Sequence, residues 1–142
     1  MRRIYFVFIF ALTLGCANTE YRFEQIDRDP PVVAPFRFGG LYGIRDGSSV
    51  KAQAEFVNGK DSLVMDIALY LRPPVEFQSG TYKGTVGGKV VAGSVECPSL
   101  TFQGGQTALP TVGGLFILKS EDGRPLYRVR IPATMLTRRP LQ

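Results

Sequence analysis

Histidine is absent from this chain of 142 residues, and cysteine occurs only twice. Without histidine the chain has no Ser-His-Asp or Cys-His catalytic site, and a zinc or iron site would lack its commonest ligand. This excludes a large share of enzyme mechanisms, while carboxylate-only chemistry stays possible. The composition therefore predicts a protein that is not an enzyme, with no catalytic residues, no metal site and no cofactor.

Clustered positive charge is lacking as well. Residues 16–142 contain 15 basic and 12 acidic residues, and their only basic run is Arg138-Arg139. Nucleic-acid binding calls for clustered Lys and Arg and usually for a recognised motif. We therefore expect no nucleic-acid partner, although the charge is compatible with a weak attraction to anionic lipid or cell-wall polymers.

The apolar run near the start of the chain is short. Residues 4–14 are apolar except for Thr13, and they lie between Arg2-Arg3 and Gly15-Cys16. These eleven residues are too few for a transmembrane helix, which needs about 20. A basic start, a short apolar region and a small residue at the cleavage site are typical of a secretory signal peptide. We assign residues 1–15 to it.

The end of this segment, Leu12 to Cys16, resembles the lipobox of bacterial lipoproteins. The resemblance covers these residues alone. It implies that Cys16 becomes the first residue of the mature protein and carries three acyl chains, palmitate among them, which anchor it stably to a membrane. Ala17 stands where an Asp would favour retention in the inner membrane, so the resemblance implies an outer-membrane lipoprotein facing the periplasm or the cell surface. The alternative is ordinary secretion as a soluble protein, with cleavage before Asn18.

Lipidation of Cys16 would leave Cys97 without an intramolecular disulfide partner. We therefore expect Cys97 to be a small buried apolar residue. Residues 16–142 amount to 127 residues, enough for one domain. We place a lipidated N-terminus and proline-rich tether at 16–35, a folded domain at 36–135 and a flexible tail at 136–142. Within the tether, Tyr21–Ile26 could add a short strand, and Asp29–Pro35 favours extended polyproline conformation; an edge segment packed on the domain is the alternative.

From Phe36 onward apolar and polar residues alternate with period two between glycine-rich breaks, and no segment shows a helical period. About eight short strands at this spacing predict an all-β, single-domain antiparallel β-sandwich, with a small β-barrel as the alternative. An early strand at Phe36–Ile44 is expected to break at Gly39-Gly40, and Leu100–Phe102 is expected to form a separate short strand.

Three hairpins follow from turn residues. With Asn58-Gly59 as loop residues, the expected pairs are Ala54 with Leu63, Ala52 with Met65, Val50 with Ile67 and, on the outer face, Lys51 with Asp66. A hairpin at Asp122-Gly123 pairs Leu118 with Tyr127 and Phe116 with Val129 on the core face, and Ile117 with Arg128 and Leu115 with Arg130 on the outer face. A third hairpin turns at Gly87-Gly88.

The longest interruption, residues 103–114, is the candidate binding element, because paired glycines permit unusual backbone angles and long loops on a β scaffold often bind. The residues proposed for it are Gly104, Gly105, Gln106, Pro110, Gly113 and Gly114. The alternative is a plain crossover. The carboxylates Glu55, Asp66, Glu76 and Glu96 are expected to be solvated surface charges.

These observations predict a lipid-anchored envelope protein that serves as a binding or scaffolding module through its sheet edges and the 103–114 loop. Its partners are the membrane, through the lipid, and an unidentified envelope protein. An accessory, pilotin-like lipoprotein of an envelope secretion or assembly machine is the alternative, on size and anchor alone. A carboxylate-dependent hydrolase of cell-wall glycans is the third hypothesis; it needs two acids converging in a cleft.

Overall fold

The structure is a computed structural model that describes residues 20–72, 74–104 and 110–138. These residues form nine strands and no helix: β1 (Arg22–Gln25), β2 (Val32–Val33), β3 (Arg37–Asp46), β4 (Ser49–Asn58), β5 (Asp61–Tyr70), β6 (Glu76–Val86), β7 (Lys89–Gln103), β8 (Thr111–Ser120) and β9 (Pro125–Met135). The prediction of an all-β fold is confirmed. None of the described residues belongs to a helix of the length and apolarity that a membrane span requires.

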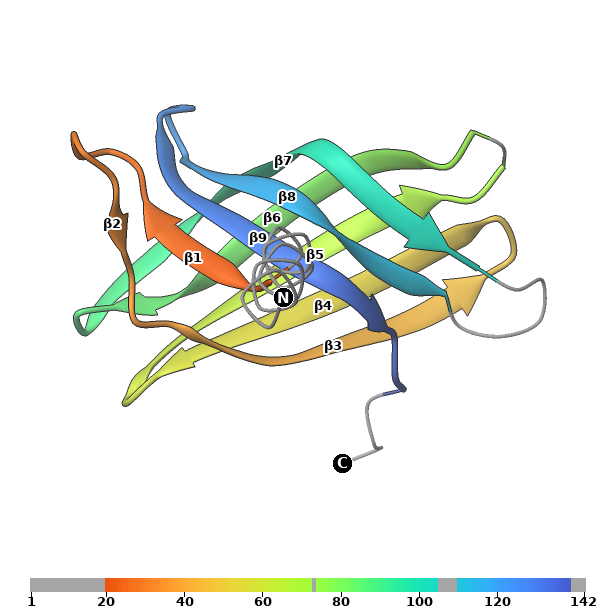
Figure 1. The fold of residues 1–142 in the computed structure, drawn as a ribbon, viewed down its shortest axis with the longest axis horizontal. Helices are drawn as coiled ribbons and strands as arrows, with labels where there is room; N and C mark the ends of the chain where they lie inside the picture. Colours follow the sequence, from red (N-terminus) through yellow and green to blue (C-terminus); the bar gives the residue numbers. More distant parts are fainter. Residues whose placement is uncertain (1–19, 73, 105–109, 139–142) are drawn as a thin grey trace, which may run out of the picture.

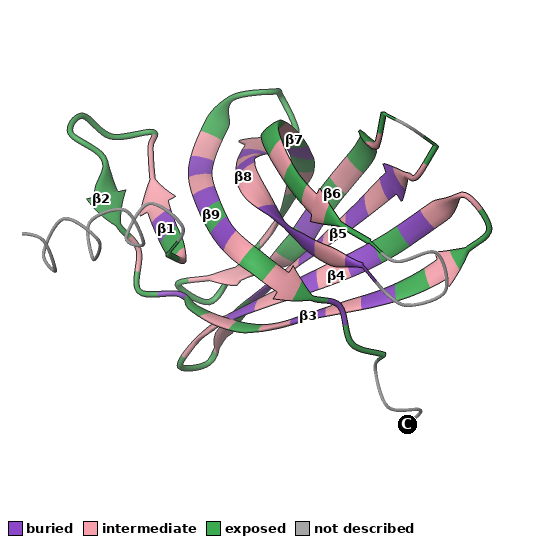
Figure 2. Ribbon diagram, turned by 45° about the vertical axis from the view of Figure 1, so that its right-hand side comes forward, coloured by how far each residue is buried: buried purple, intermediate pink, exposed green. Residues whose placement is uncertain are grey.

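All nine strands belong to one antiparallel sheet with the order β2-β1-β9-β8-β7-β6-β5-β4-β3 (Figure 1). Strands β3 to β9 pair in chain order, while β1 adds beside β9. The sheet curls on itself as a half-barrel (Figure 2), so β1 comes close to the start of β3. Tyr21 stacks on Phe38 with ring centroids 5.7 Å apart, and Phe23 packs against Phe36 at 5.1 Å. The architecture is thus the barrel-like form of the predicted β domain.

The inner face of the curled sheet forms the core, and the alternating pattern of the sequence explains which residues lie there. The inward residues of β4 and β5 are each at most 3% exposed: Val50, Ala52, Ala54, Phe56, Leu63, Met65, Ile67 and Leu69. Each large apolar side chain buried in this way contributes about 1.5–3 kcal/mol. The faces predicted for both strands are confirmed.

The register predicted for the β4–β5 hairpin is wrong by two residues. Asn58 pairs with Asp61, so Gly59 and Lys60 form the loop, and Ala54 lies opposite Met65. Gly59 has φ +61°, whereas no described residue other than glycine has positive φ. Glycine at the first loop position is typical of a type II′ turn, whereas the expected type I′ turn would need positive φ at Asn58 too. A shift of two keeps every side chain on its face.

The other two hairpin predictions are confirmed. Phe116 pairs with Val129 and Leu118 with Tyr127 between β8 and β9, and Leu115 pairs with Arg130 on the outer face. In the β6–β7 hairpin Val86 pairs with Lys89 across Gly87-Gly88.

Two expected breaks are bulges within continuous strands. In β3 the register shifts between Phe38 and Gly40 rather than ending a strand. Strand β7 continues to Gln103 through a shift between Glu96 and Ser99, so residues 100–102 are not a separate strand. A bulge inserts an unpaired residue and bends the strand without ending it. Cys97 lies within the β7 bulge and is only partly buried, not buried as predicted.

Both segments outside the predicted domain join the sheet where the structure describes them. Residues 22–25 form β1, and Phe23 is 1% exposed, so this part of the predicted tether lies in the fold. The predicted flexible tail is also partly packed. Leu136 is 2% exposed, and the backbone of Thr137 exchanges hydrogen bonds with Leu41 and Gly43 of β3. Apolar side chains hold these segments in place because their burial offsets the entropy of ordering them.

Candidate functional site

The glycine-rich stretch chosen from the sequence is mainly strand where it is described. Gly113 and Gly114 lie in β8, where Gly114 pairs with Leu100 and Ile131. A Cβ on Gly114 would lie 2.2 Å from the Ser99 carbonyl oxygen, so glycine permits the close approach of two backbones.

Of the remaining candidate residues, the structure describes Gly104 and Pro110, which lie close together: a Cβ on Gly104 would lie 3.3 Å from the Cβ of Pro110. The Pro110 carbonyl accepts a hydrogen bond from the Leu136 amide, and Gly104 is exposed after the end of β7. Gly105 and Gln106 lie outside the described residues, as does Cys16. The interruption was predicted to extend to Gly114, whereas β8 already begins at Thr111.

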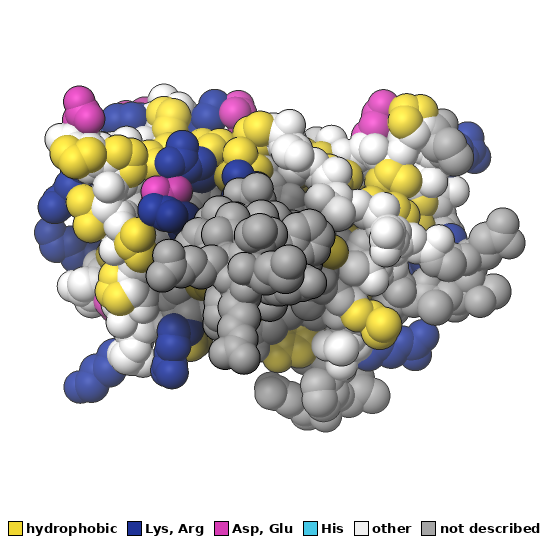
Figure 3. Space-filling model, viewed as in Figure 1, with side chains coloured by type: hydrophobic (Ala, Val, Ile, Leu, Met, Phe, Trp, Pro, Cys, Tyr) yellow, Lys and Arg dark blue, Asp and Glu magenta, His cyan; other side chains and the backbone are white. Residues whose placement is uncertain are grey.

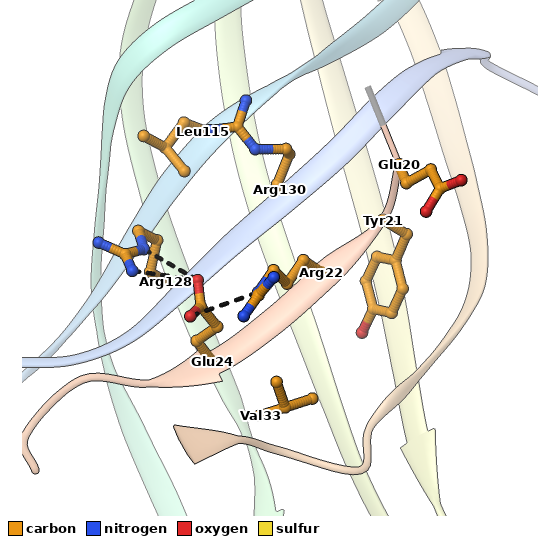
Figure 4. Close-up of a pocket in the computed structure, with 8 residues that line it drawn as sticks. All are labelled: Glu20, Tyr21, Arg22, Glu24, Val33, Leu115, Arg128 and Arg130. Carbon is orange, nitrogen blue, oxygen red and sulfur yellow. Dashed lines mark hydrogen bonds and ion pairs between the residues drawn. The ribbon is translucent and has the colours of Figure 1, made fainter. Parts of the chain in front are cut away.

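A different surface, the outer face of β1, β8 and β9, forms an open groove of about 870 Å³. Its lining residues are Glu20, Tyr21, Arg22, Glu24, Val33, Leu115, Arg128 and Arg130. Figure 4 shows the carboxylate of Glu24 between the guanidinium groups of Arg128 and Arg22. We call this surface the arginine groove.

Strand register explains why these side chains meet. Arg22 of β1 lies directly opposite Arg130 of β9, which in turn lies opposite Leu115 of β8. Two residues along the strands, Glu24 lies opposite Arg128. Because side chains two residues apart share a face of a strand, both rows project outward together. Phe23 lies between them in β1 and points into the core.

Glu24 is the electrostatic centre of the groove. Its Oε1 accepts hydrogen bonds from Nε and Nη2 of Arg128 at 3.2 and 3.1 Å, and its Oε2 lies 3.3 Å from Nε of Arg22. The Glu24 side chain is 12% exposed, whereas those of Arg22 and Arg128 are 59% and 40% exposed. The carboxylate therefore holds two guanidinium groups that remain accessible to solvent.

Arg130 forms no ion pair with any residue in the described part of the chain, and it is exposed. It lies across from Arg22, and like charges placed directly opposite in a sheet are destabilising. A bound anion between these guanidinium groups would relieve that repulsion. Guanidinium groups bind carboxylate and phosphate oxygens in paired, charge-assisted hydrogen bonds, so the arrangement is suited to anion binding.

Tyr21 closes the groove toward the core. Its hydroxyl donates a hydrogen bond to the Phe36 carbonyl oxygen at 2.7 Å, and burial raises the pKa of the phenol. The hydroxyl therefore keeps its proton and serves as a structural donor between β1 and the start of β3.

Cys97 is the one free cysteine among the described residues. Burial raises its pKa to about 11, although the nearby Ser99 backbone opposes this shift. The thiolate is the reactive form of cysteine, so Cys97 is a poor nucleophile at neutral pH.

The four carboxylates singled out in the sequence lie on four different strands, and none lines the arginine groove. Asp66 pairs with Gln53 rather than Lys51 because of the register shift, and it accepts a hydrogen bond from the Gln53 amide at 2.8 Å. The same shift places Glu55 opposite Val64, closer to Asp66 than expected. Glu96 forms an exposed ion pair with Lys119.

No group of three or more potential metal ligands occurs within residues 20–72, 74–104 and 110–138. No protein-family model, curated protein or solved structure matches the chain.

The arginine groove was not predicted from the sequence. The outward position of Arg128 and Arg130 was expected from the β8–β9 hairpin and is confirmed. The pairing of β1 with β9 was not expected, because it joins Glu24 to a residue 104 positions later. The sequence signal available was the alternation Arg22-Phe23-Glu24, in which a single core residue separates two charges.

Proposed function

We propose that this protein is a lipid-anchored module of the bacterial outer membrane that binds a partner without catalysing a reaction, and that the arginine groove is a binding surface. The observation that carries the proposal is the order of segments at the start of the chain. A basic pair, a short apolar run and Gly15-Cys16 precede the first strand of the domain, which begins at Arg22.

The arginine groove supports a binding role. It combines exposed cations with a carboxylate that positions them, which is an arrangement for holding an anionic group. A glycan hydrolase would instead need an acid pair flanking its substrate in a cleft. The two carboxylates of the groove, Glu20 and Glu24, differ in role, because Glu24 is bound to two arginines and Glu20 points away from them (Figure 4).

Intact-mass analysis of protein extracted from membranes tests the anchor. We expect the wild-type chain to begin at Cys16 with the added mass of three acyl chains, because that number holds a protein stably in a bilayer. Cys16→Ser should lack this mass. Cys97→Ser, which removes the other cysteine, is the matched control and should keep it. A wild-type chain that begins at Asn18, without acyl chains and free in the periplasm, would overturn the proposal.

A further inference from the structure

The arginine groove lies beside the point where the described chain begins. Glu20 lines the groove, and Cys16 is four residues before it. Four residues span at most about 14 Å, since an extended chain covers about 3.3–3.6 Å per residue. A lipid on Cys16 would therefore be attached within about 14 Å of the groove. The tether expected from the sequence would have allowed a far greater separation, but β1 takes up part of it.

The charges on this face suit a membrane surface. Arg22, Arg128 and Arg130 project from the outer face and outnumber the two carboxylates that line the groove with them. Glu24 is only 12% exposed, and Glu20, which is exposed, points away from the arginines (Figure 4). Figure 3 shows basic side chains gathered over β1, β2 and the neighbouring part of β9. Basic residues close to an anionic membrane surface each contribute about 1 kcal/mol to binding.

The edge of the groove is apolar and exposed. Val33 of β2 lies opposite Glu24, lines the groove and is 59% exposed, and Val32 beside it is 48% exposed. Apolar side chains next to guanidinium groups fit the boundary between headgroups and acyl chains, where apolar groups enter the bilayer and charged groups stay at the phosphates.

We propose that the arginine groove binds the phosphates of anionic phospholipid headgroups in the membrane that carries the lipid anchor. This inference rests on the proposed function. It means that the protein does not swing freely on its lipid. The face formed by β1, β9 and β8 lies against the bilayer.

Sedimentation with vesicles tests the proposal on the mature chain, residues 16–142 with Cys16→Ser, which retains every strand and carries no lipid. We expect binding to vesicles of phosphatidylcholine with phosphatidylglycerol and none to phosphatidylcholine alone. Arg130→Glu should weaken binding about tenfold or more, since it reverses a charge at the surface. Lys89→Glu, at the exposed β6–β7 turn outside the groove, changes the net charge equally and should weaken binding less than about twofold.

Three results would overturn the proposal. Equal effects of Arg130→Glu and Lys89→Glu would show that net charge alone drives binding. Binding of inorganic phosphate that Arg130→Glu abolishes, together with no binding to anionic vesicles, would assign the site to a free anion. Absence of binding to anionic vesicles would exclude the headgroup. Because no acyl chain is present in this assay, these failures are distinct from a failure of the anchor, which the mass of the membrane-extracted protein reports.

Discussion

The glycine-rich start of β8 and the arginine groove were both candidates for function, and they differ in what the fold requires of them. At Gly114 a side chain would collide with the backbone of β7, so the fold itself demands glycine. At Arg22 and Arg130 two like charges lie opposite each other on an exposed face, which the fold tolerates but does not need. Residues that lower stability and that the fold does not require are better indicators of function than residues that the fold requires.

The largest expected effect tests the structural role of the glycines. Gly114→Ala should lower the free energy of unfolding by about 3 kcal/mol, because the new Cβ would meet the Ser99 carbonyl and because φ is +146° there. Gly47→Ala is the control. Gly47 also has positive φ, +59°, but no atom lies within 4 Å of its added Cβ, so the expected loss is about 1 kcal/mol. Urea denaturation measures the free energy of unfolding of both variants. Equal losses in the two would contradict the prediction that Gly114 is the more constrained position.

A smaller effect is expected at the centre of the groove. Glu24→Gln should lower the free energy of unfolding by about 1 kcal/mol, and by less at high salt, because Arg22 and Arg128, both partly exposed, would lose the carboxylate that binds them. Glu96→Gln breaks the ion pair with Lys119. Because the Glu96 side chain is 59% exposed, the free energy of unfolding should fall by about 0.5 kcal/mol or less. The prediction fails if the two variants lose the same stability and respond to salt alike.

The smallest effect is expected at the cation that has no carboxylate partner among the described residues. Arg130→Ala should change the free energy of unfolding by less than about 0.5 kcal/mol, or raise it, since the repulsion with Arg22 is relieved. Arg128→Ala should cost more, about 1 kcal/mol, because it removes two hydrogen bonds to Glu24. Thermal unfolding of the two variants side by side checks the order, and a larger loss for Arg130→Ala would contradict it.

The hairpins show how far sequence reasoning reaches. Alternation assigned the correct face to every inward residue of β4 and β5, but their register was off by two because Gly59, not Asn58, takes the first loop position. In β8–β9 the paired register was correct, including the outward Arg128 and Arg130. The face of the sheet on which a side chain lies repeats every two residues along a strand. A register error of two residues therefore leaves each side chain on its correct face but gives it the wrong partner.

The candidate site was less predictable than the fold. Glycines in β8 were taken for a binding loop because glycine favours both irregular loops and close strand contacts, and sequence does not distinguish the two. The arginine groove depends on β1 lying beside β9, and nothing local to either strand indicates that pairing.

The amino-acid sequence by itself determined the all-β fold, the inward faces of β4 and β5 and the positions of three hairpins, because these depend on neighbours within a few residues. A short strand at residues 21–26 was expected, but only the tertiary structure decided that β1 pairs with β9, that Leu136 is buried and that Arg22 meets Arg130. Those contacts join residues about a hundred positions apart, and burial of Phe23 in the common core holds them together.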